Sequence, residues 1–204
     1  MQELRTKRKG VFICVEGIDG SGKTTQAHIL VEALKKEGFE AVYTTEPSNG
    51  VFGKMLRKHI LEGSRRVPVV VEAVLFAVDR FDHIESEVKP LLRRGKIVVS
   101  DRYVYSSIAY QGALSLSKKW LKEINNRAIK PDLSIFIDVP PEIVIGRINR
   151  QKSVMETLQT QKRVREAYLK LVDEEDLLVV DGASSKKEVA ERIQKVVFNF
   201  LSSD

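Results

Sequence analysis

The chain has 204 residues, of which 43% are hydrophobic, and its 34 basic residues outnumber 28 acidic ones for a formal charge of +6. This length suits one domain with a buried core, so we treat residues 1–204 as a single domain. No apolar run reaches the roughly 20 residues of a membrane span, and the charged N-terminus lacks an apolar signal core. The one cysteine, Cys14, excludes an internal disulfide and a cysteine-rich metal site. We expect a cytoplasmic protein with no membrane partner.

Basic residues are spread along the chain and are densest at Arg5–Lys9. Such an excess suits nucleic-acid binding, but it suits equally well an enzyme that holds several phosphate groups. A short charged run of this kind is usually a solvated arm. We therefore expect small phosphorylated ligands and no nucleic-acid partner.

Five short apolar runs are nearly continuous, which is typical of strands covered on both faces. They are Val11–Glu16, Ala41–Thr45, Lys96–Asp101, Leu133–Val139 and Leu177–Asp181. Helical patterns lie between or after them, at Thr24–Lys36, Val69–Arg93, Pro141–Arg150, Glu156–Val172 and Lys186–Phe200. This alternation predicts an α/β fold with a five-stranded parallel sheet and helices on both faces. Ligands of such folds bind at the carboxyl ends of the strands.

The first strand end carries EGIDGSGKTTQ, residues 16–26, which matches the phosphate-binding P-loop pattern. Glycines let successive backbone N–H groups point at the β-phosphate, and the start of the next helix adds positive potential. Lys23 is placed to bridge the β- and γ-phosphates of a bound nucleotide. A chance glycine-rich turn is the alternative. The residues expected at the ATP phosphates are Gly17, Ile18, Asp19, Gly20, Ser21, Gly22, Lys23, Thr24 and Thr25.

A P-loop site needs a carboxylate near Mg²⁺, at a neighbouring strand end. Asp101 closes the third apolar run and is the first candidate, while Asp138 closes the fourth and is the second. Either could instead be an ordinary strand-end or helix-capping carboxylate. We expect Mg²⁺ to be held by the Thr24 hydroxyl and Asp101.

The stretch LFAVDRFDH, residues 75–83, places Phe76 and Arg80 four residues apart on one helix face. An aromatic ring beside a guanidinium can stack on a base and donate to its carbonyl edge. The alternative is an ordinary amphipathic helix, with Phe76 in the core and Arg80 paired with Asp79 or Glu85.

The stretch SDRYVYSSIAYQG, residues 100–112, begins at the third strand end. Arg102 follows the candidate metal ligand directly, where its cation could hold an acceptor phosphate. The polar side chains after it are Ser106, Ser107, Tyr110 and Gln111. So many polar groups in a segment that should enter the core indicate a polar pocket. The alternative is a solvated loop with capping serines.

Together these motifs resemble thymidylate kinases. EGIDGSGKTTQ, LFAVDR and DRYVYSSIAYQGA occur in that order, FIDVPPE and VREAYLKL extend the match, and the resemblance covers about Val11 to Asp181. It implies a P-loop kinase three-layer fold, and an enzyme that transfers the γ-phosphoryl group of ATP to dTMP with Mg²⁺, in dTTP synthesis. The chain departs from the family where Thr45, in place of an arginine, precedes Glu46-Pro47, which leaves room for a relaxed choice of acceptor.

The resemblance also implies roles at the base. Phe76 stacks on thymine, Arg80 bonds its O4 atom, and Ser107 and Gln111 meet the base edge.

Further implied roles concern the sugar and the phosphate of the acceptor. Arg102 binds the acceptor phosphate and Asp19 the 3′-hydroxyl group. Tyr103 lies near the sugar, and Tyr110 belongs to the same pocket.

Charge on the moving phosphoryl group requires a further cation. Some family members carry an arginine in the P-loop where this chain has Gly20, so we expect the cation on a lid segment at about residues 147–157. Arg147 and Arg150 are three residues apart and share a helix face, and Lys152 follows them. A solvated basic helix end is the alternative. The residues expected to act in catalysis are Asp19, Lys23, Arg102, Arg147 and Arg150.

Two other functions remain open from the sequence. One is a nucleoside monophosphate kinase with a broader choice of acceptor, and the other is a P-loop NTPase linked to nucleic acid. An NTPase has no use for a second pocket for a base and a phosphate, which favours the kinase. The resemblance further implies a homodimer, and the run Val69–Val78 is more apolar than one buried helix face requires.

Overall fold

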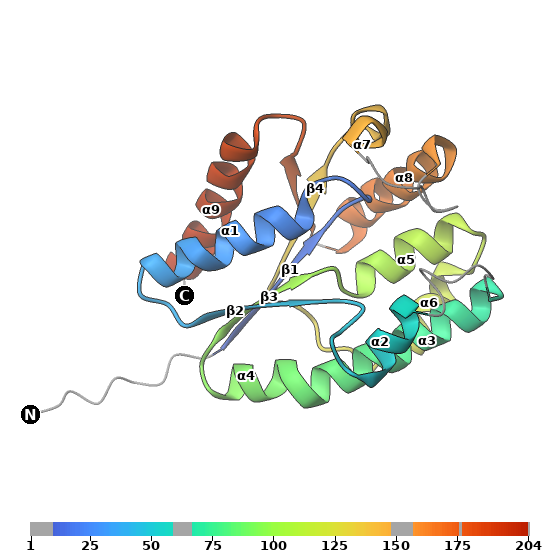
Figure 1. The fold of residues 1–204 in the computed structure, drawn as a ribbon, viewed down its shortest axis with the longest axis horizontal. Coiled ribbons are helices and arrows are strands. Elements are labelled where there is room, and N and C mark those ends of the chain that lie inside the picture. Colours follow the sequence, from blue (N-terminus) through green and yellow to red (C-terminus); the bar gives the residue numbers. More distant parts are fainter. Residues whose placement is uncertain (1–9, 59–66, 148–156, 176, 204) are drawn as a thin grey trace, which may run out of the picture.

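In the computed structural model, which describes residues 10–58, 67–147, 157–175 and 177–203, five strands form one parallel sheet in the order β2-β3-β1-β4-β5. The strands are β1 (Val11–Glu16), β2 (Ala41–Thr45), β3 (Ile97–Asp101), β4 (Leu133–Asp138) and β5 (Leu177–Asp181). All five predicted strands are confirmed, and only β3 and β4 are a residue shorter than expected. The fold is the predicted α/β fold of P-loop kinases (Figure 1).

The helices cover both faces of this sheet. They are α1 (Lys23–Lys36), α2 (Val51–Leu56), α3 (Val69–His83), η2 (Ile84–Val88), α4 (Lys89–Arg93), α5 (Val104–Ala113), α6 (Lys118–Ile124), α7 (Pro141–Arg147), α8 (Leu158–Glu175) and α9 (Lys186–Ser202). Helices α1 and α9 pack together on one face, and α3, α5 and α8 lie over the other (Figure 1). The predicted helix 69–93 is three successive segments, with the wider-wound η2 between α3 and α4.

The core lies between the sheet and these two helix layers. Every residue of β3 is buried, as is every residue of β1 after Val11, because both strands are central and covered on both faces. Cys14 of β1 is buried and contacts Ser134 Oγ of β4 at 3.2 Å. None of the described helices is long and apolar enough to cross a lipid bilayer.

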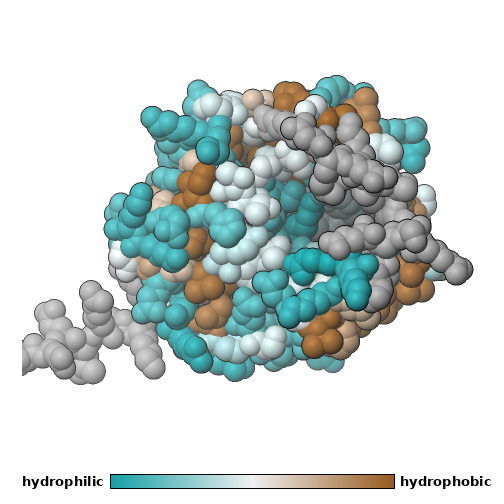
Figure 2. Space-filling view, in the orientation of Figure 1, coloured by the Kyte–Doolittle hydropathy of each residue, from teal (hydrophilic) through white to brown (hydrophobic). Residues whose placement is uncertain are grey.

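The carboxyl ends of all five strands point the same way because the sheet is parallel. The P-loop follows β1, the 46–50 loop follows β2, and Arg102 follows β3. Figure 2 shows that the middle of the viewed face is hollowed and is lined mainly by hydrophilic and neutral side chains. This edge of the sheet is where a ligand of such a fold binds.

Candidate active site

The P-loop joins β1 to α1 through three glycines, Gly17, Gly20 and Gly22, in backbone conformations that other residues rarely adopt. Gly17 has φ of 153°, and a Cβ atom there would lie 2.9 Å from Ile137 O. Gly22 has φ of 93°, immediately before Lys23 starts α1, and no side chain caps this helix start. The loop therefore curls tightly around the start of α1, as a backbone cradle for phosphate requires.

Lys23 is held across this loop. Its side chain is buried, and Nζ donates to Ile18 O at 2.7 Å. The pKa of Lys23 is lowered to about 8. Burial is the largest cause and the nearby Arg102 cation also lowers the pKa, whereas the carboxylates of Asp101, Asp19 and Glu16 raise it. A bound polyphosphate would supply the negative charge that favours the ammonium form.

The candidate metal ligands meet beside the loop. The Thr24 hydroxyl donates to Asp101 Oδ2, and the Tyr43 hydroxyl lies 3.4 Å from the same oxygen. The other oxygen, Asp101 Oδ1, is buried and has no hydrogen-bond partner among the described residues. A hydroxyl beside a carboxylate with a spare oxygen fits Mg²⁺, which binds through one or two protein oxygens together with substrate phosphates. Asp138, the second candidate, is instead paired with Arg165 at 2.6 and 2.8 Å.

Asp19 of the P-loop is joined to Arg102 at the end of β3. Arg102 Nη2 donates to Asp19 Oδ1, Nη1 donates to Ser106 Oγ at 3.0 Å, and the guanidinium lies 4.9 Å from the centre of the Tyr110 ring. Burial raises the pKa of Asp19, but Arg102 and Lys23 lower it more, so the net shift is downward and the carboxylate is ionised. An anion and a cation thus lie between the P-loop and α5.

The backbone at Arg102 is held in an unusual conformation, with φ of 74°. Glu16, the buried last residue of β1, accepts hydrogen bonds from Tyr103 N at 2.9 Å, Ser106 Oγ at 2.6 Å and the Tyr168 hydroxyl at 2.8 Å. Arg102 N also donates to Val15 O at 3.0 Å. These bonds hold the turn that aims the Arg102 guanidinium at Asp19. The sequence analysis missed Glu16, although a carboxylate ending an apolar strand was a visible signal.

Helix α8 reaches the same place through Gln161, which is buried. Its Oε1 accepts from Asp19 N at 3.2 Å, and its Nε2 donates to Asp19 Oδ2 at 3.4 Å. Asp19 is therefore positioned from two sides, by α8 and by Arg102.

A second cluster of buried polar side chains lies between α3 and α5. Glu72, Phe76 and Arg80 follow each other at four-residue spacing along α3, and Ser107 and Gln111 do so along α5. Gln111 Nε2 donates to Glu72 Oε1 at 2.9 Å, and Arg80 Nη2 donates to Ser107 Oγ at 3.0 Å. The two helices therefore run in opposite directions with Phe76 between two polar contacts. Phe76 is half-buried and lies outside the buried apolar core.

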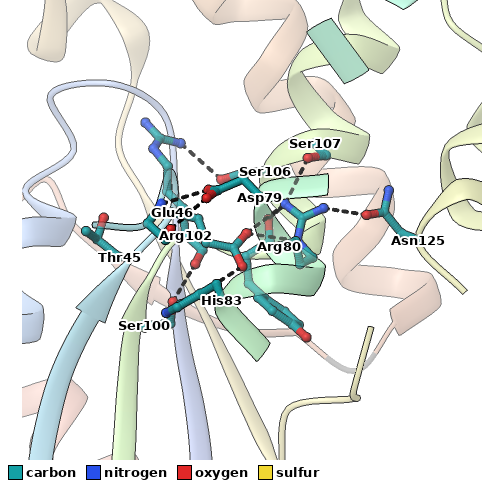
Figure 3. Close-up of polar contacts among 12 residues, drawn as sticks. Thr45, Glu46, Asp79, Arg80, His83, Ser100, Arg102, Ser106, Ser107 and Asn125 are labelled. Atoms are coloured by element: carbon teal, nitrogen blue, oxygen red, sulfur yellow. Dashed lines mark hydrogen bonds and ion pairs between the residues drawn. The ribbon is translucent and has the colours of Figure 1, made fainter. Parts of the chain in front are cut away.

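Arg80 is the centre of a buried hydrogen-bond network (Figure 3). Its Nε donates to Glu46 Oε2 at 2.8 Å, and the two Nη atoms also contact Asn125 Oδ1, Ser107 Oγ and Tyr103 O. It pairs with neither Asp79 nor Glu85, the partners that an ordinary surface helix would offer. Asp79 instead accepts from the backbone N–H and hydroxyl of Ser48 at 2.7 and 2.6 Å.

Glu46 itself is positioned by His83, which was not expected from the sequence. His83 Nδ1 lies 3.3 Å from Glu46 Oε1, and its Nε2 lies 2.6 Å from Thr44 Oγ1. Since a carboxylate only accepts, His83 donates from Nδ1 to Glu46. This arrangement orients the carboxylate that holds Arg80.

Tyr103 and Tyr110 occupy different surroundings. The Tyr103 ring is buried edge-on against Phe12, at 4.9 Å, and its hydroxyl donates to Ile129 O at 3.0 Å, so its phenol is committed to the core. Tyr110 lies over Arg102 instead.

The predicted lid cations are not described by the structure. Arg150 and Lys152 lie outside the described residues. Arg147 ends α7, and its side chain is also outside the description.

Comparisons of the sequence with known proteins identify the family. The sequence model of the family described as thymidylate kinase matches residues 15–193. A protein of Thermococcus gammatolerans named a "probable thymidylate kinase" is 41% identical over 191 residues, covering 88% of this chain and 92% of its own length. Similarly named proteins of Pyrococcus abyssi and Thermococcus kodakarensis are 41% and 42% identical, and cover 93% and 80% of this chain and 96% and 84% of their own lengths. By its P-loop and these matches, the chain belongs to the thymidylate kinase family.

Proposed function

We propose that this protein transfers the γ-phosphoryl group of ATP to dTMP, giving ADP and dTDP for dTTP synthesis, with Mg²⁺ as the metal. The observation that carries the proposal is the buried polar cluster between α3 and α5. It offers a buried donor, Arg80, an amide oxygen without a partner among the described residues, Gln111 Oε1, and the half-buried ring of Phe76. Thymine has an acceptor at O4, a donor at N3–H and a flat face, which matches these three groups.

The remaining acceptor contacts follow from this position of the base. Arg102 binds the acceptor phosphate, since its guanidinium is the cation between the P-loop and α5. Asp19 accepts the 3′-hydroxyl of the sugar, and Tyr110, rather than the buried Tyr103, lies beside the sugar. Ser107 meets the base edge together with Gln111. Arg80 and Ser107 are already bonded to each other at 3.0 Å, so the donor side of the pocket is pre-formed.

The donor phosphates belong in the P-loop. Backbone N–H groups of residues 17–25 and the Lys23 ammonium bind the β- and γ-phosphates. Thr24 and Asp101 would hold Mg²⁺, which neutralises charge on the phosphates when bound. No general base is required, because the acceptor phosphate is already ionised near pH 7. The work of this chain is to align two polyanions and cancel their repulsion.

The segment at about residues 147–157 is proposed as a lid on this single domain. Its place between α7 and α8 supports the proposal, because Gln161 at the start of α8 contacts Asp19. Arg147 and Arg150 would then bring positive charge to the moving phosphoryl group.

A homodimer and a cytoplasmic location complete the proposal. Val70, Val71 and Val74 lie on one side of α3 and are 49%, 43% and 41% exposed, which suits an apolar contact with a second copy. Sedimentation of wild type and of Val74→Glu tests this, and a wild-type monomer would remove the dimer without affecting the chemistry. The single buried thiol, Cys14, suits a reducing compartment.

Coupled ADP release with ATP, Mg²⁺ and a panel of nucleoside monophosphates tests the activity. We expect turnover with dTMP well above that with other acceptors. Comparable turnover with several acceptors would keep the reaction but indicate a broader kinase, in line with Thr45 before Glu46-Pro47. ADP release that does not depend on any nucleoside monophosphate, and that increases when DNA is added, would overturn the proposal in favour of an NTPase.

A further inference from the structure

The Gln111 side chain is hydrogen-bonded to Glu72, a residue to which the proposed function gives no role. Its Nε2 donates to Glu72 Oε1 at 2.9 Å, and the two side chains are 3% and 2% exposed. Glu72 is two helical turns before Arg80 on α3. A carboxylate buried next to a pocket residue calls for an explanation.

The chemistry of the pair determines which way the amide faces. An ionised carboxylate can only accept hydrogen bonds, so it must face the NH₂ group of Gln111 and not the carbonyl. The carbonyl oxygen is thereby turned away from Glu72. It is buried and has no hydrogen-bond partner among the described residues. A buried acceptor without a donor is costly, so its direction indicates a ligand that donates.

The packing of α3 against α5 shows where that oxygen belongs. The Glu72–Gln111 contact and the Arg80–Ser107 contact are at the two ends of the same interface, with Phe76 between them. A flat ring stacked on Phe76 would therefore have Arg80 at one side and Gln111 at the other. The pocket offers a donor from Arg80 and an acceptor from Gln111.

We propose that Glu72 is a positioning residue that sets the choice of base, by fixing the Gln111 amide so that the pocket presents an acceptor to the N3–H of a thymine or uracil ring. Cytosine has an acceptor at N3 and an amino group at C4. Its N3 would therefore place an acceptor against the acceptor Gln111 Oε1, and its amino group would place a donor against the donor Arg80. Without Glu72 the amide can turn over and offer its NH₂ group to cytosine N3. This inference rests on the proposed function, because it concerns the same acceptor pocket.

Glu72→Gln and Glu72→Met test it. A glutamine can pair with either orientation of the Gln111 amide, and a methionine of similar size removes the partner altogether without leaving a buried charge. The measured quantity is the ratio of kcat/KM for dTMP to kcat/KM for dCMP, two acceptors that share their sugar and phosphate. We expect the ratio to fall about tenfold in both variants, the effect of one neutral hydrogen bond. Glu85→Gln, which changes an exposed carboxylate further along the same helical stretch, should leave the ratio unchanged.

A merely structural role for Glu72 would lower both kcat/KM values together and leave their ratio intact, and that result would overturn the inference. The double variant Glu72→Gln/Gln111→Leu sharpens the test. If Glu72 acts through Gln111, adding Glu72→Gln to Gln111→Leu causes no further change in the ratio. A further fall of similar size would also contradict the inference. Failure of the wild type to phosphorylate dTMP would instead refute the proposed function, and the inference with it.

Discussion

The P-loop and the buried polar cluster between α3 and α5 are built in different ways. The proposed donor site is a single loop of consecutive residues, with Lys23 and Thr24 at its end. The acceptor site is assembled from buried side chains of α3, α5 and the 46–50 loop, each held by a polar partner. ATP is held by a common phosphate feature, whereas the acceptor must be told apart from similar nucleotides. A phosphate can be bound largely by backbone N–H groups and a cation, whereas a choice between bases requires oriented side chains.

The largest expected effect belongs to neither of these two regions. Arg150→Ala should lower kcat by roughly 10³-fold or more if the lid cation acts like an arginine finger, since charge on the moving phosphoryl group would lose its partner. The KM values for both substrates should change much less. Single-turnover kinetics would check this, and a kcat within tenfold of wild type would remove Arg150 from the mechanism.

On the acceptor side, Arg80→Met should cost about 3–5 kcal/mol of unfolding free energy, because it leaves Glu46 buried without its cation. It should also weaken dTMP binding while leaving ATP binding intact. Arg165→Met is the matched control, since the Arg165 and Asp138 side chains are 31% and 19% exposed and the loss should be about 1 kcal/mol or less. Denaturant unfolding measures both. Equal losses would mean that burial does not distinguish the two ion pairs.

On the donor side, Gly17→Ala and Gly22→Ala separate two kinds of backbone constraint. At Gly22 a Cβ atom would meet nothing within 4 Å, so only the positive φ matters and the cost should be about 1–2 kcal/mol. At Gly17 the Cβ atom would also press on Ile137 O at 2.9 Å, for a total of about 2–5 kcal/mol. Thermal unfolding of the two variants gives the order, and a Gly22 variant less stable than the Gly17 variant would contradict this description of the loop.

The one expected effect that requires no substitution is a pH dependence of ATP binding. The pKa of Lys23 is about 8, lowered from 10.5, so the free protein loses this proton as pH rises through about 8 while ATP binds the protonated form. The affinity for ATP should be flat below pH 8 and then fall by up to about tenfold per pH unit, until the pKa of the complex is reached. In the free protein the same shift adds stability as pH rises from about 8 to 10.5, because the unfolded chain then binds more protons than the folded one.

Calorimetric titration with ATP between pH 6 and 10 measures the affinity. Lys23→Arg carries a cation that does not titrate in this range, so the decline should disappear in any residual binding that this variant retains. A decline of the same size in Lys23→Arg would assign the titration to another group.

The sequence predicted the fold and the P-loop motif, because both depend on neighbours in the chain. The apolar runs gave all five strands within a residue, and the P-loop residues are consecutive. The acceptor site depends on pairs far apart in the chain. Arg80 and Glu46 are 34 residues apart, and Gln111 and Glu72 are 39 apart. Residue types alone could suggest Arg80 and Gln111, but only the packing of α3 on α5 and on the loop after β2 supplies their partners.

Tyr103 and Asp138 illustrate the same limit. Both stand next to strand ends, where ligands of this fold bind, and both look available in the sequence. The ring of Tyr103 turns into the core against Phe12, and Asp138 is taken by Arg165 of α8. Which strand-end residue faces the ligand depends on the next turn and on the helix that covers it.

The most direct test of the central claim is to follow the labelled γ-phosphoryl group of ATP in the presence of dTMP and Mg²⁺. The account predicts that the label appears in dTDP, in an amount equal to the ADP formed, and that omitting dTMP nearly abolishes ADP formation. Label recovered as inorganic phosphate, at a rate that does not depend on dTMP, would contradict it.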